Sequence, residues 1–263
     1  MSRIEAVTLD FGNTLVPVPA GGLRGVVAQT AGGMAERFGP FAVEDVLHAW
    51  HEERERQFRE EVPQFREVDM AQRITRILAR LRGMAPPPGE LRWDDAAAAL
   101  LSDPAEVAWA LEVYESAFVA TLPPEPAAGG LLRRLADRYR LAILSNWPLA
   151  ATIDRYVEAA GWSPYLAAVV VSQRVGTIKP HPAIFAAART ALGEPPPSSI
   201  CHVGDDWAAD IVGAKRAGWR AAYLAVRPED SPLPGSERDG EVEADLELTS
   251  LEGLEAGLAA LDA

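Results

Sequence analysis

Short apolar segments alternate with helical segments along the second half of this chain, and this alternation constrains the fold more than any other feature. The expected strands are 141–144, 167–172, 199–203, 220–226 and 244–248. The expected helices are 150–161, 182–192, 207–218 and 251–261. Repeated β–α alternation is typical of a parallel sheet that is covered by helices on both faces. With a further apolar strand at 4–9, the sequence predicts an α/β fold built on a Rossmann-like parallel sheet.

The region between residues 18 and 122 has a different pattern. Helical periodicity covers the segments 23–38, 43–61, 69–82 and 104–121, and no strand signal lies between them. The chain then returns to the sheet through an expected helix at 130–139. We therefore expect an α-helical domain at 18–122, inserted into a Rossmann-like core that consists of residues 1–17 and 123–263.

The charge balance limits the classes of partner. Lys and Arg total 25 against 38 Asp and Glu, which gives a formal net charge of −13. This acidity disfavours nonspecific binding to nucleic acid and to anionic membranes. No apolar stretch reaches the roughly 20 residues of a membrane span, and the apolar start is too short for a signal peptide. The single cysteine, Cys201, excludes an intramolecular disulfide and is expected in the core. These features indicate a cytoplasmic protein.

Asp10 is the first residue with a chemical signal. It follows the apolar strand 4–9 and precedes Gly12 and Asn13, so it lies where a strand ends and a tight turn begins. In parallel sheets, ligands bind at the carboxyl ends of the strands. A carboxylate there can act as a nucleophile or as a metal ligand, whereas the plainer interpretation is a turn aspartate.

Two further strand ends carry polar groups. Ser145 and Asn146 follow the strand 141–144, where a hydroxyl and backbone amides can bind a phosphoryl oxygen, although Ser-Asn after a strand also forms ordinary turns. Lys179 is one of only two lysines among 25 basic residues, and it precedes Pro180 in an expected loop. Its compact ammonium can neutralise phosphate oxygens and a carboxylate. The other lysine, Lys215, is expected at a helix C-terminus, where a cation is favourable.

An acidic cluster follows the strand 199–203. Gly204 ends the strand, Asp205 and Asp206 follow it, and Asp210 lies one turn into the next helix. Helix capping accounts for one of these carboxylates, but three so close together repel one another unless a cation or solvent relieves the repulsion. Oxygen ligands of this kind suit Mg²⁺.

Taken in order, these four regions resemble the haloacid dehalogenase-like superfamily, whose members are mostly phosphatases. The matching motifs are LDFGNT, LSN, the lysine of IKPHPAIF, and the GDxxxxD spacing that begins at Gly204. The helical segment after the first motif resembles the helical cap of that family. The resemblance implies that Asp10 attacks phosphorus and forms an aspartyl-phosphate. It also implies that Thr14, Ser145 and Asn146 hold the phosphoryl oxygens, and that Lys179 neutralises charge on Asp10 and on the phosphoryl group.

The resemblance further implies Mg²⁺ as the cofactor. The ion is expected to bind Asp10, the backbone carbonyl of Gly12 and Asp205, with Asp210 nearby or bound through water. On this basis the chain is expected to be a Mg²⁺-dependent phosphatase of a small phosphorylated metabolite. No nucleic acid or membrane partner is expected, and the protein is expected to be a monomer or a homodimer.

Gly12 departs from the family pattern. Phosphatases of the family usually carry a second Asp two residues after the nucleophile, as general acid and base, and glycine cannot transfer protons. Loss of such help typically costs about 10²- to 10⁴-fold in rate. Three alternatives stay open: a phosphatase for substrates with good leaving groups such as acyl or anomeric sugar phosphates, a 2-haloacid dehalogenase-type hydrolase, or a non-catalytic phosphate-binding or regulatory protein.

Several other residues have weaker signals. Trp147 directly follows Ser145-Asn146 and is a candidate for the pocket wall. Arg66, Arg73 and Trp93 are conceivable substrate contacts from the helical domain, although surface or core positions are the plainer interpretation for each. The Pro-rich and acidic segment 228–243 is expected to be an exposed loop.

Overall fold

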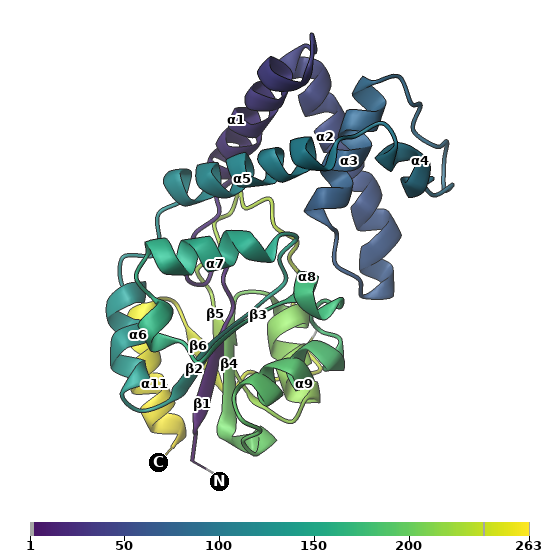
Figure 1. Ribbon diagram of the computed structural model, residues 1–263. Helices are drawn as coiled ribbons and strands as arrows, with labels where there is room; N and C mark the ends of the chain where they lie inside the picture. The colour runs from purple at the N-terminus through teal and green to yellow at the C-terminus, as the bar shows by residue number, and fades with distance from the viewer. Residues whose placement is uncertain (1–2, 239, 263) are drawn as a thin grey trace.

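The protein is built on one parallel sheet, described here from a computed structural model that covers residues 3–238 and 240–262. Within these residues the sheet has six strands in the order β3-β2-β1-β4-β5-β6, and every neighbouring pair is parallel (Figure 1). The strands are β1 (Ala6–Leu9), β2 (Arg140–Ser145), β3 (Ala168–Val171), β4 (Ile200–Gly204), β5 (Arg220–Leu224) and β6 (Leu246–Leu248). The predicted α/β fold is therefore confirmed.

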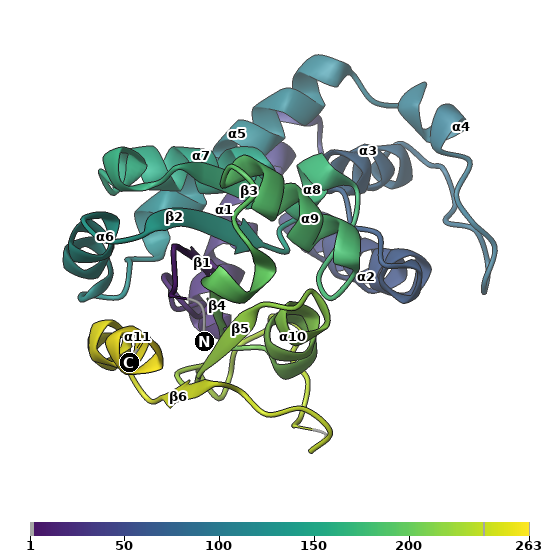
Figure 2. The ribbon, with the colours of Figure 1, turned by 90° about the horizontal axis from the view of Figure 1, so that it is seen from below.

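Helices cover both faces of this sheet, as Figure 2 shows from below. One face packs against α6 (Ala128–Ala136), α7 (Ala150–Ala159) and α11 (Leu254–Leu261). The other face packs against α9 (Pro182–Ala191), the π-helical segment η4 (Trp207–Val212) and α10 (Gly213–Arg216). Successive strand residues point to opposite faces, so Val7 and Leu9 belong to the first core and Ala6 to the second. This two-sided burial explains why most of the strand residues are apolar.

The chain order around β1 determines where a ligand can bind. From β1 the chain moves outward through β2 to β3, and it then returns to the other side of β1 for β4, β5 and β6. The order thus reverses beside β1, and in such sheets ligands bind at the carboxyl ends of the strands next to the reversal. Leu9 of β1 lies level with Ile143 of β2 and with Val203 of β4. The residues that follow these three strands are therefore brought together.

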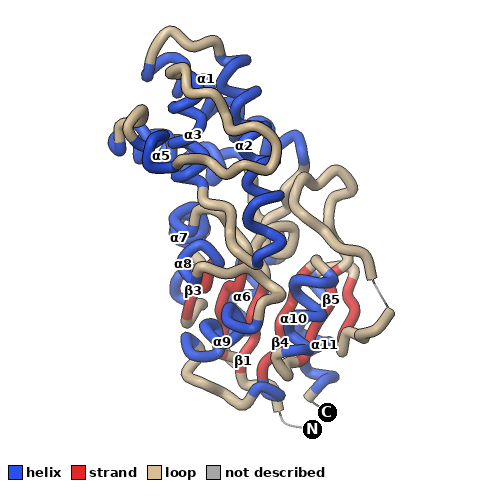
Figure 3. The backbone as a smooth tube through the Cα atoms, turned by 90° about the vertical axis from the view of Figure 1, so that its right-hand side faces the viewer, coloured by secondary structure: helices blue, strands red, loops and turns tan. Residues whose placement is uncertain are grey.

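A helical insert lies between β1 and β2, and it stands over the carboxyl ends of the strands (Figures 1 and 3). Its α-helices are α1 (Ala20–Phe38), α2 (Val43–Glu61), α3 (Met70–Leu81), α4 (Asp95–Ala99) and α5 (Pro104–Thr121). Asp69 caps α3, and Asp103 begins α5 with a capping box that is completed by Glu106. The short helix α4 has no counterpart among the expected segments. The domain boundaries proposed above, 1–17 with 123–263 and 18–122, stay a prediction.

The core of the insert is continuous with the core on one face of the sheet. Phe11, directly after β1, lies in ring contact with Phe118 of α5 and with Tyr156 of α7. Trp147 contacts the rings of Phe11 and Phe118 as well. This aromatic group fixes the insert above the strand ends, and the space between the two is where the polar residues gather. No helix in the described part of the chain is long and apolar enough to span a bilayer.

Candidate active site

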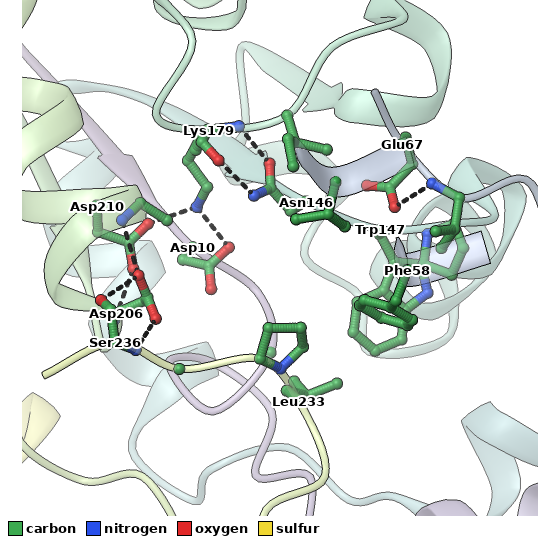
Figure 4. A pocket seen from close by; sticks show the side chains of 18 of the residues that line it. Asp10, Phe58, Glu67, Asn146, Trp147, Lys179, Asp206, Asp210, Leu233 and Ser236 are labelled. Carbon is green, nitrogen blue, oxygen red and sulfur yellow. Dashed lines mark hydrogen bonds and ion pairs between the residues drawn. The ribbon is translucent and has the colours of Figure 1, made fainter. Parts of the chain in front are cut away.

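A cavity of about 320 Å³ lies between the strand ends and the helical insert. Figure 4 shows Asp10, Lys179 and Asp210 on one side of it and Phe58 and Glu67 on the other. Asp10 comes from the end of β1, and Phe58 comes from α2 of the insert. The cavity therefore has a charged side that the sheet supplies and a largely apolar side that the insert supplies.

Lys179 is the centre of the charged side. Only 3% of its surface is exposed, and Nζ donates to Asp10 Oδ1 at 2.9 Å, to Asp210 Oδ1 at 2.6 Å and to the carbonyl oxygen of Leu144 at 2.9 Å. These three acceptors use all three ammonium protons. The pKa of Lys179 is raised, because the attraction of Asp10 and Asp210 outweighs the cost of burying the charge. Lys179 is therefore a fixed cation beside Asp10.

Three hydrogen-bonding partners fix the position of the Asp210 carboxylate. Besides Lys179, its Oδ1 lies 3.0 Å from Nε2 of His202, and its Oδ2 accepts the backbone N–H of Asp206 at 2.9 Å. It packs directly on Gly204, where an added Cβ would lie 2.2 Å from the Asp210 carboxyl carbon. Burial raises the pKa of Asp210, but Lys179 and His202 outweigh it and hold that pKa below its usual range. Asp210 is therefore an ionised group that orients Lys179.

Asp205 is held by a second set of donors. Its Oδ2 accepts from Nε of Arg227 at 2.7 Å and from the amide of Asn13 at 3.4 Å, and its Oδ1 accepts the Thr14 hydroxyl at 3.4 Å. Asn13 has a φ of 57°, the left-handed conformation that Asn tolerates in turns. Thr14 is buried and bonded to a carboxylate in this structure, and its role as a phosphate ligand stays a prediction.

The carboxylates outnumber the cations in the site. Asp10, Asp205 and Asp210 each offer an oxygen within 4.8 Å of the others, against the charges of Lys179 and Arg227. Burial raises the pKa of Asp205 to about 7, with repulsion from Asp10 and Asp210 adding to it. Burial likewise raises the pKa of Asp10, against the opposing attraction of Lys179. A divalent cation among these oxygens would remove that repulsion, and buried carboxylate oxygens are suitable ligands for Mg²⁺.

Asn146 positions the lysine loop. Its side-chain oxygen accepts the backbone N–H of Lys179 at 2.7 Å, and its side-chain nitrogen donates to the Lys179 carbonyl at 3.1 Å. Asn146 also lines the cavity, whereas Ser145 is buried at the end of β2. Trp147 forms part of the cavity wall, and its backbone N–H donates to the Ser172 hydroxyl. The predicted phosphate contacts of Ser145 and Asn146 stay predictions.

Comparison with known proteins agrees with this arrangement. The family model of the haloacid dehalogenase-like hydrolases matches residues 4–218. The chain belongs to the haloacid dehalogenase-like hydrolase family.

Individual relatives match shorter stretches. The chain is 29% identical over 121 residues to pyrimidine 5′-nucleotidase YjjG of Escherichia coli (strain K12), covering 46% of this chain and 53% of that protein. It is 30% identical over 145 residues to glyceraldehyde 3-phosphate phosphatase of Methanopyrus kandleri, covering 52% of this chain and 61% of that protein. The matched region thus spans between half and two thirds of the length of these curated relatives.

A similar fold has been solved for a 2-haloacid dehalogenase from Pseudomonas syringae pv. Tomato DC3000. It superposes with a TM-score of 0.69 at 24% identity, over 98% of this chain and 99% of that chain. A phosphatase of the haloacid dehalogenase-like group from Thermococcus onnurineus superposes with a TM-score of 0.60 at 20% identity, over 99% and 100% of the two chains. At these identities the likeness establishes the haloacid dehalogenase-like fold alone.

In this member of the family, a loop after β5 contributes to the wall of the cavity. Residues 231, 233 and 236 belong to the segment expected to be an exposed loop, yet Leu233 and Ser236 line the cavity. Ser236 bonds to Asp206 through its N–H and its hydroxyl, and the Ser231 hydroxyl bonds to Asn13. The loop rises from β5 toward the insert, as Figure 3 shows. The segment is a loop with residues 234–236 exposed, as expected, but its contacts with Asp206 and Asn13 also make it part of the cavity wall, which its polar and Pro-rich composition does not indicate.

The loop is also attached to the helical insert. Arg54 of α2 donates from Nη2 to the carbonyl oxygen of Pro232 at 2.9 Å. Leu233 extends over Gly12, so that a Cβ at Gly12 would lie 2.7 Å from Leu233 Cδ1. We name residues 227–236 the strap, since they connect Asp205, Gly12 and the insert. In the sequence, the signal that could have identified it is Arg227, a cation that directly follows the expected strand 220–226.

Of the remaining candidate residues, two line the cavity and the others lie elsewhere. Asp206 caps η4 by accepting the N–H of Ala209, which is the capping role expected for one acid of the cluster. Arg66 pairs with Glu61 on the surface, and Trp93 is buried with its indole N–H on Glu53. Lys215 forms an ion pair with Asp245 at 2.9 Å, away from the cavity. Arg73 is different, because it is buried and lines the cavity.

Proposed function

We propose that this protein is a Mg²⁺-dependent phosphatase of small phosphorylated metabolites, with Asp10 as its nucleophile. The observation that carries the proposal is the position of Asp10: its carboxylate faces the cavity at a strand end, and its Oδ1 is bonded to the buried ammonium of Lys179. A carboxylate held in this way presents its second oxygen to a substrate in a fixed direction. The sequence match to a phosphatase and a nucleotidase supports the same chemistry.

The proposed reaction has two steps at phosphorus. Asp10 Oδ2 forms a bond to phosphorus while the bond from phosphorus to the ester oxygen breaks, and the leaving group departs with the electron pair. Water then attacks phosphorus, and the bond between phosphorus and the Asp10 oxygen breaks, which releases inorganic phosphate and restores the carboxylate. Lys179 stays protonated throughout, because its pKa is raised, and it reduces the repulsion between Asp10 and an anionic phosphoryl group.

The residues at the strand ends fit a magnesium ion. Asp10 and Asp205 would hold it, with the Gly12 carbonyl as a further ligand and Asp210 beside it. Such an ion supplies charge neutralisation for the phosphoryl oxygens in the transition state. Asp210 has both oxygens engaged by Lys179, His202 and the Asp206 N–H, so its own part is to fix the ammonium beside Asp10.

Gly12 determines which substrates suit this site. It offers no acid at the place where related phosphatases usually have a second Asp, so the leaving group departs without a proton from that position. We therefore propose substrates whose leaving groups are stable as anions, such as acyl or anomeric sugar phosphates. Leu233 and Trp147 occupy the space beside Gly12 and keep it apolar.

Hydrolysis of p-nitrophenyl phosphate tests the proposal. We expect release of phosphate that requires Mg²⁺, stops on addition of EDTA, and is abolished in Asp10→Asn, which keeps the shape of the side chain and removes its charge. Halide release from 2-chloropropionate is measured in parallel. Dehalogenation that persists in EDTA, with no phosphate release, would replace the proposal by the dehalogenase alternative. Saturable phosphate binding with no turnover of either substrate would favour the alternative of a non-catalytic phosphate-binding protein.

A further inference from the structure

Arg73 is a buried cation with no counter-ion. It lies on α3 with 4% of its surface exposed. Its Nε donates to the Gln57 side-chain oxygen at 2.8 Å, and its Nη1 contacts the sulfur of Met70 at 3.8 Å. No carboxylate of residues 3–238 or 240–262 lies within ion-pair distance of it, and its Nη2 has no hydrogen-bond partner among them. Burying a charge in this state is costly, and such groups are normally paired.

The other arginines of the same helix show that the insert can supply counter-ions. Arg76, three residues on, is as buried as Arg73 and pairs with Glu60 and Asp95 at 3.2 and 2.8 Å. Arg80 pairs with Glu52 and Glu53. Arg73 differs from both in that it lines the cavity. Burial lowers the pKa of Arg73 to about 10, so its guanidinium still carries a full charge at neutral pH.

Tyr114 lies in the same wall of the cavity. It comes from α5, is buried, and its hydroxyl makes no hydrogen bond to any residue that the structure describes. Burial raises the pKa of this phenol to about 12, with the nearby charges of Arg73 and Arg54 opposing the rise, so the hydroxyl is a neutral donor. Arg54 is already engaged by Glu55 and by the Pro232 carbonyl. Arg73 and Tyr114 thus line the cavity with hydrogen-bond donors that no described residue accepts.

We propose, on the basis of the phosphatase function proposed above, that Arg73 and Tyr114 form a subsite for a carboxylate at the far end of the phosphorylated substrate. The phosphate would lie at Asp10 and Lys179, and the cavity wall that includes Phe58, Met70 and Trp147 would contact an apolar connecting segment. A planar carboxylate matches the two outer nitrogens of a guanidinium.

A single negative charge fits this wall better than a second phosphate. Arg73 supplies one unpaired positive charge, and Glu67 lines the same cavity with its oxygens on the Val68 N–H and the Ser172 hydroxyl. Burial raises the pKa of Glu67, and its hydrogen bonds to Ser172 and Val68 and the charge of Arg73 oppose the rise. A phosphate dianion would leave one charge uncompensated in a largely apolar wall, which is costly.

Binding of phosphonates tests the subsite without requiring turnover. The probes are ω-carboxyalkylphosphonates with two to five methylene groups, each paired with the corresponding amide, which has the same size and lacks the charge. In calorimetry with Mg²⁺ present, the best carboxylate should bind the wild type roughly 10- to 100-fold more tightly than its amide, the range for a charge-assisted hydrogen bond. Arg73→Met should remove this preference and leave affinity for the amide unchanged. Arg73→Lys should keep part of it, and Tyr114→Phe should reduce it by about 2- to 10-fold.

Arg76→Met is the matched control on the same helix. It removes two ion pairs, so it should lower the unfolding temperature while the preference for the carboxylate persists. Equal affinity for every acid and amide, a preference that survives Arg73→Met, or tighter binding of the corresponding alkyl bisphosphonates would each overturn the carboxylate subsite. Hydrolysis of p-nitrophenyl phosphate together with equal affinities would refute the subsite alone. Discrimination without any phosphatase activity would refute the proposed function alone.

Discussion

Placing an acid at position 12 should change how this enzyme depends on its leaving group. In the wild type, we expect kcat/KM for aryl phosphates to rise steeply as the pKa of the leaving phenol falls, because Gly12 supplies no proton. Gly12→Asp introduces a carboxyl group beside the nucleophile, and general acid catalysis typically contributes about 10²- to 10⁴-fold. The gain should be largest for alkyl phosphates and smallest for p-nitrophenyl phosphate, so the dependence should flatten.

A steric contact between position 12 and Leu233 limits the rate gain that we expect from Gly12→Asp. A Cβ at Gly12 would lie 2.7 Å from Leu233 Cδ1 and 3.3 Å from Trp147 Cζ3, and Gly12 is not in the left-handed backbone region. The obstacle is therefore the end of one flexible side chain on the strap, and overpacking of this kind costs about 1–3 kcal/mol. We expect Gly12→Asp alone to gain at the low end of the range, and the double variant Gly12→Asp, Leu233→Ala to gain more.

The assay is a series of phenyl phosphates of graded leaving-group pKa, together with one alkyl phosphate, measured under kcat/KM conditions. Gly12→Asn is the matched control, since it has the same size and no transferable proton, and Leu233→Ala alone controls for the strap. If the dependence on leaving-group pKa were equally steep in the double variant and in Gly12→Asn, a missing acid at position 12 would not explain this site. A flat dependence in the wild type, with chemistry rate-limiting, would show that another group donates the proton.

Three further outcomes follow from contacts around the site. Lys179→Met leaves Asp10 and Asp210 buried without their cation, so it should abolish turnover and lower the free energy of unfolding of the metal-free protein by about 3–5 kcal/mol in urea denaturation. Lys215→Met breaks an exposed pair and should lower that free energy by less than about 1 kcal/mol. A decrease of less than about 1 kcal/mol for Lys179→Met would contradict a stabilising buried pair. Arg227→Met removes the cation on Asp205, so Mg²⁺ should raise its unfolding temperature by more than it raises that of the wild type, and an equal rise would show that Arg227 does not offset that charge. Burial raises the pKa of the Cys201 thiol to about 12, so iodoacetamide should not label the native protein even above pH ~8.5, where the thiol of the unfolded chain ionises. Because only the unfolded state loses this proton, the free energy of unfolding should fall as the pH rises above ~8.5. Rapid labelling of the native protein would place Cys201 outside the core.

The sequence predicted the features that depend on local pattern. The strands at 4–9 and 199–203 are apolar segments that end in a turn, and Asp10 and Asp205 follow them at the expected strand ends. The expected helix at 207–218 divides into η4 and α10, because Asp210 turns back onto Gly204 and bonds the Asp206 N–H, and wide turns of this kind recur at functional sites.

The features that the sequence did not predict depend on contacts between distant segments. The strap has the composition of a surface loop, and its position follows from the pairing of Arg227 with Asp205 and of Ser231 with Asn13. Arg73, Arg66 and Trp93 were indistinguishable as candidates. A signal for Arg73 does exist, because it falls in the apolar stripe of α3 with Met70, Ile74 and Ile77, so a helical projection places it on the buried face. The lack of a counter-ion beside Arg73 is determined by α2, α5 and the other segments that pack against α3, and the pattern within α3 does not reveal it.

Acid quench of the enzyme during turnover, followed by mass spectrometry of its peptides, identifies the residue that attacks phosphorus. With Mg²⁺ and an excess of an aryl phosphate, we expect a peptide that carries one phosphoryl group on Asp10, labile to hydroxylamine and absent in Asp10→Asn. Rapid release of the phenol with no phosphorylated peptide, or a phosphoryl group on any other residue, would contradict the assignment of Asp10 as the nucleophile.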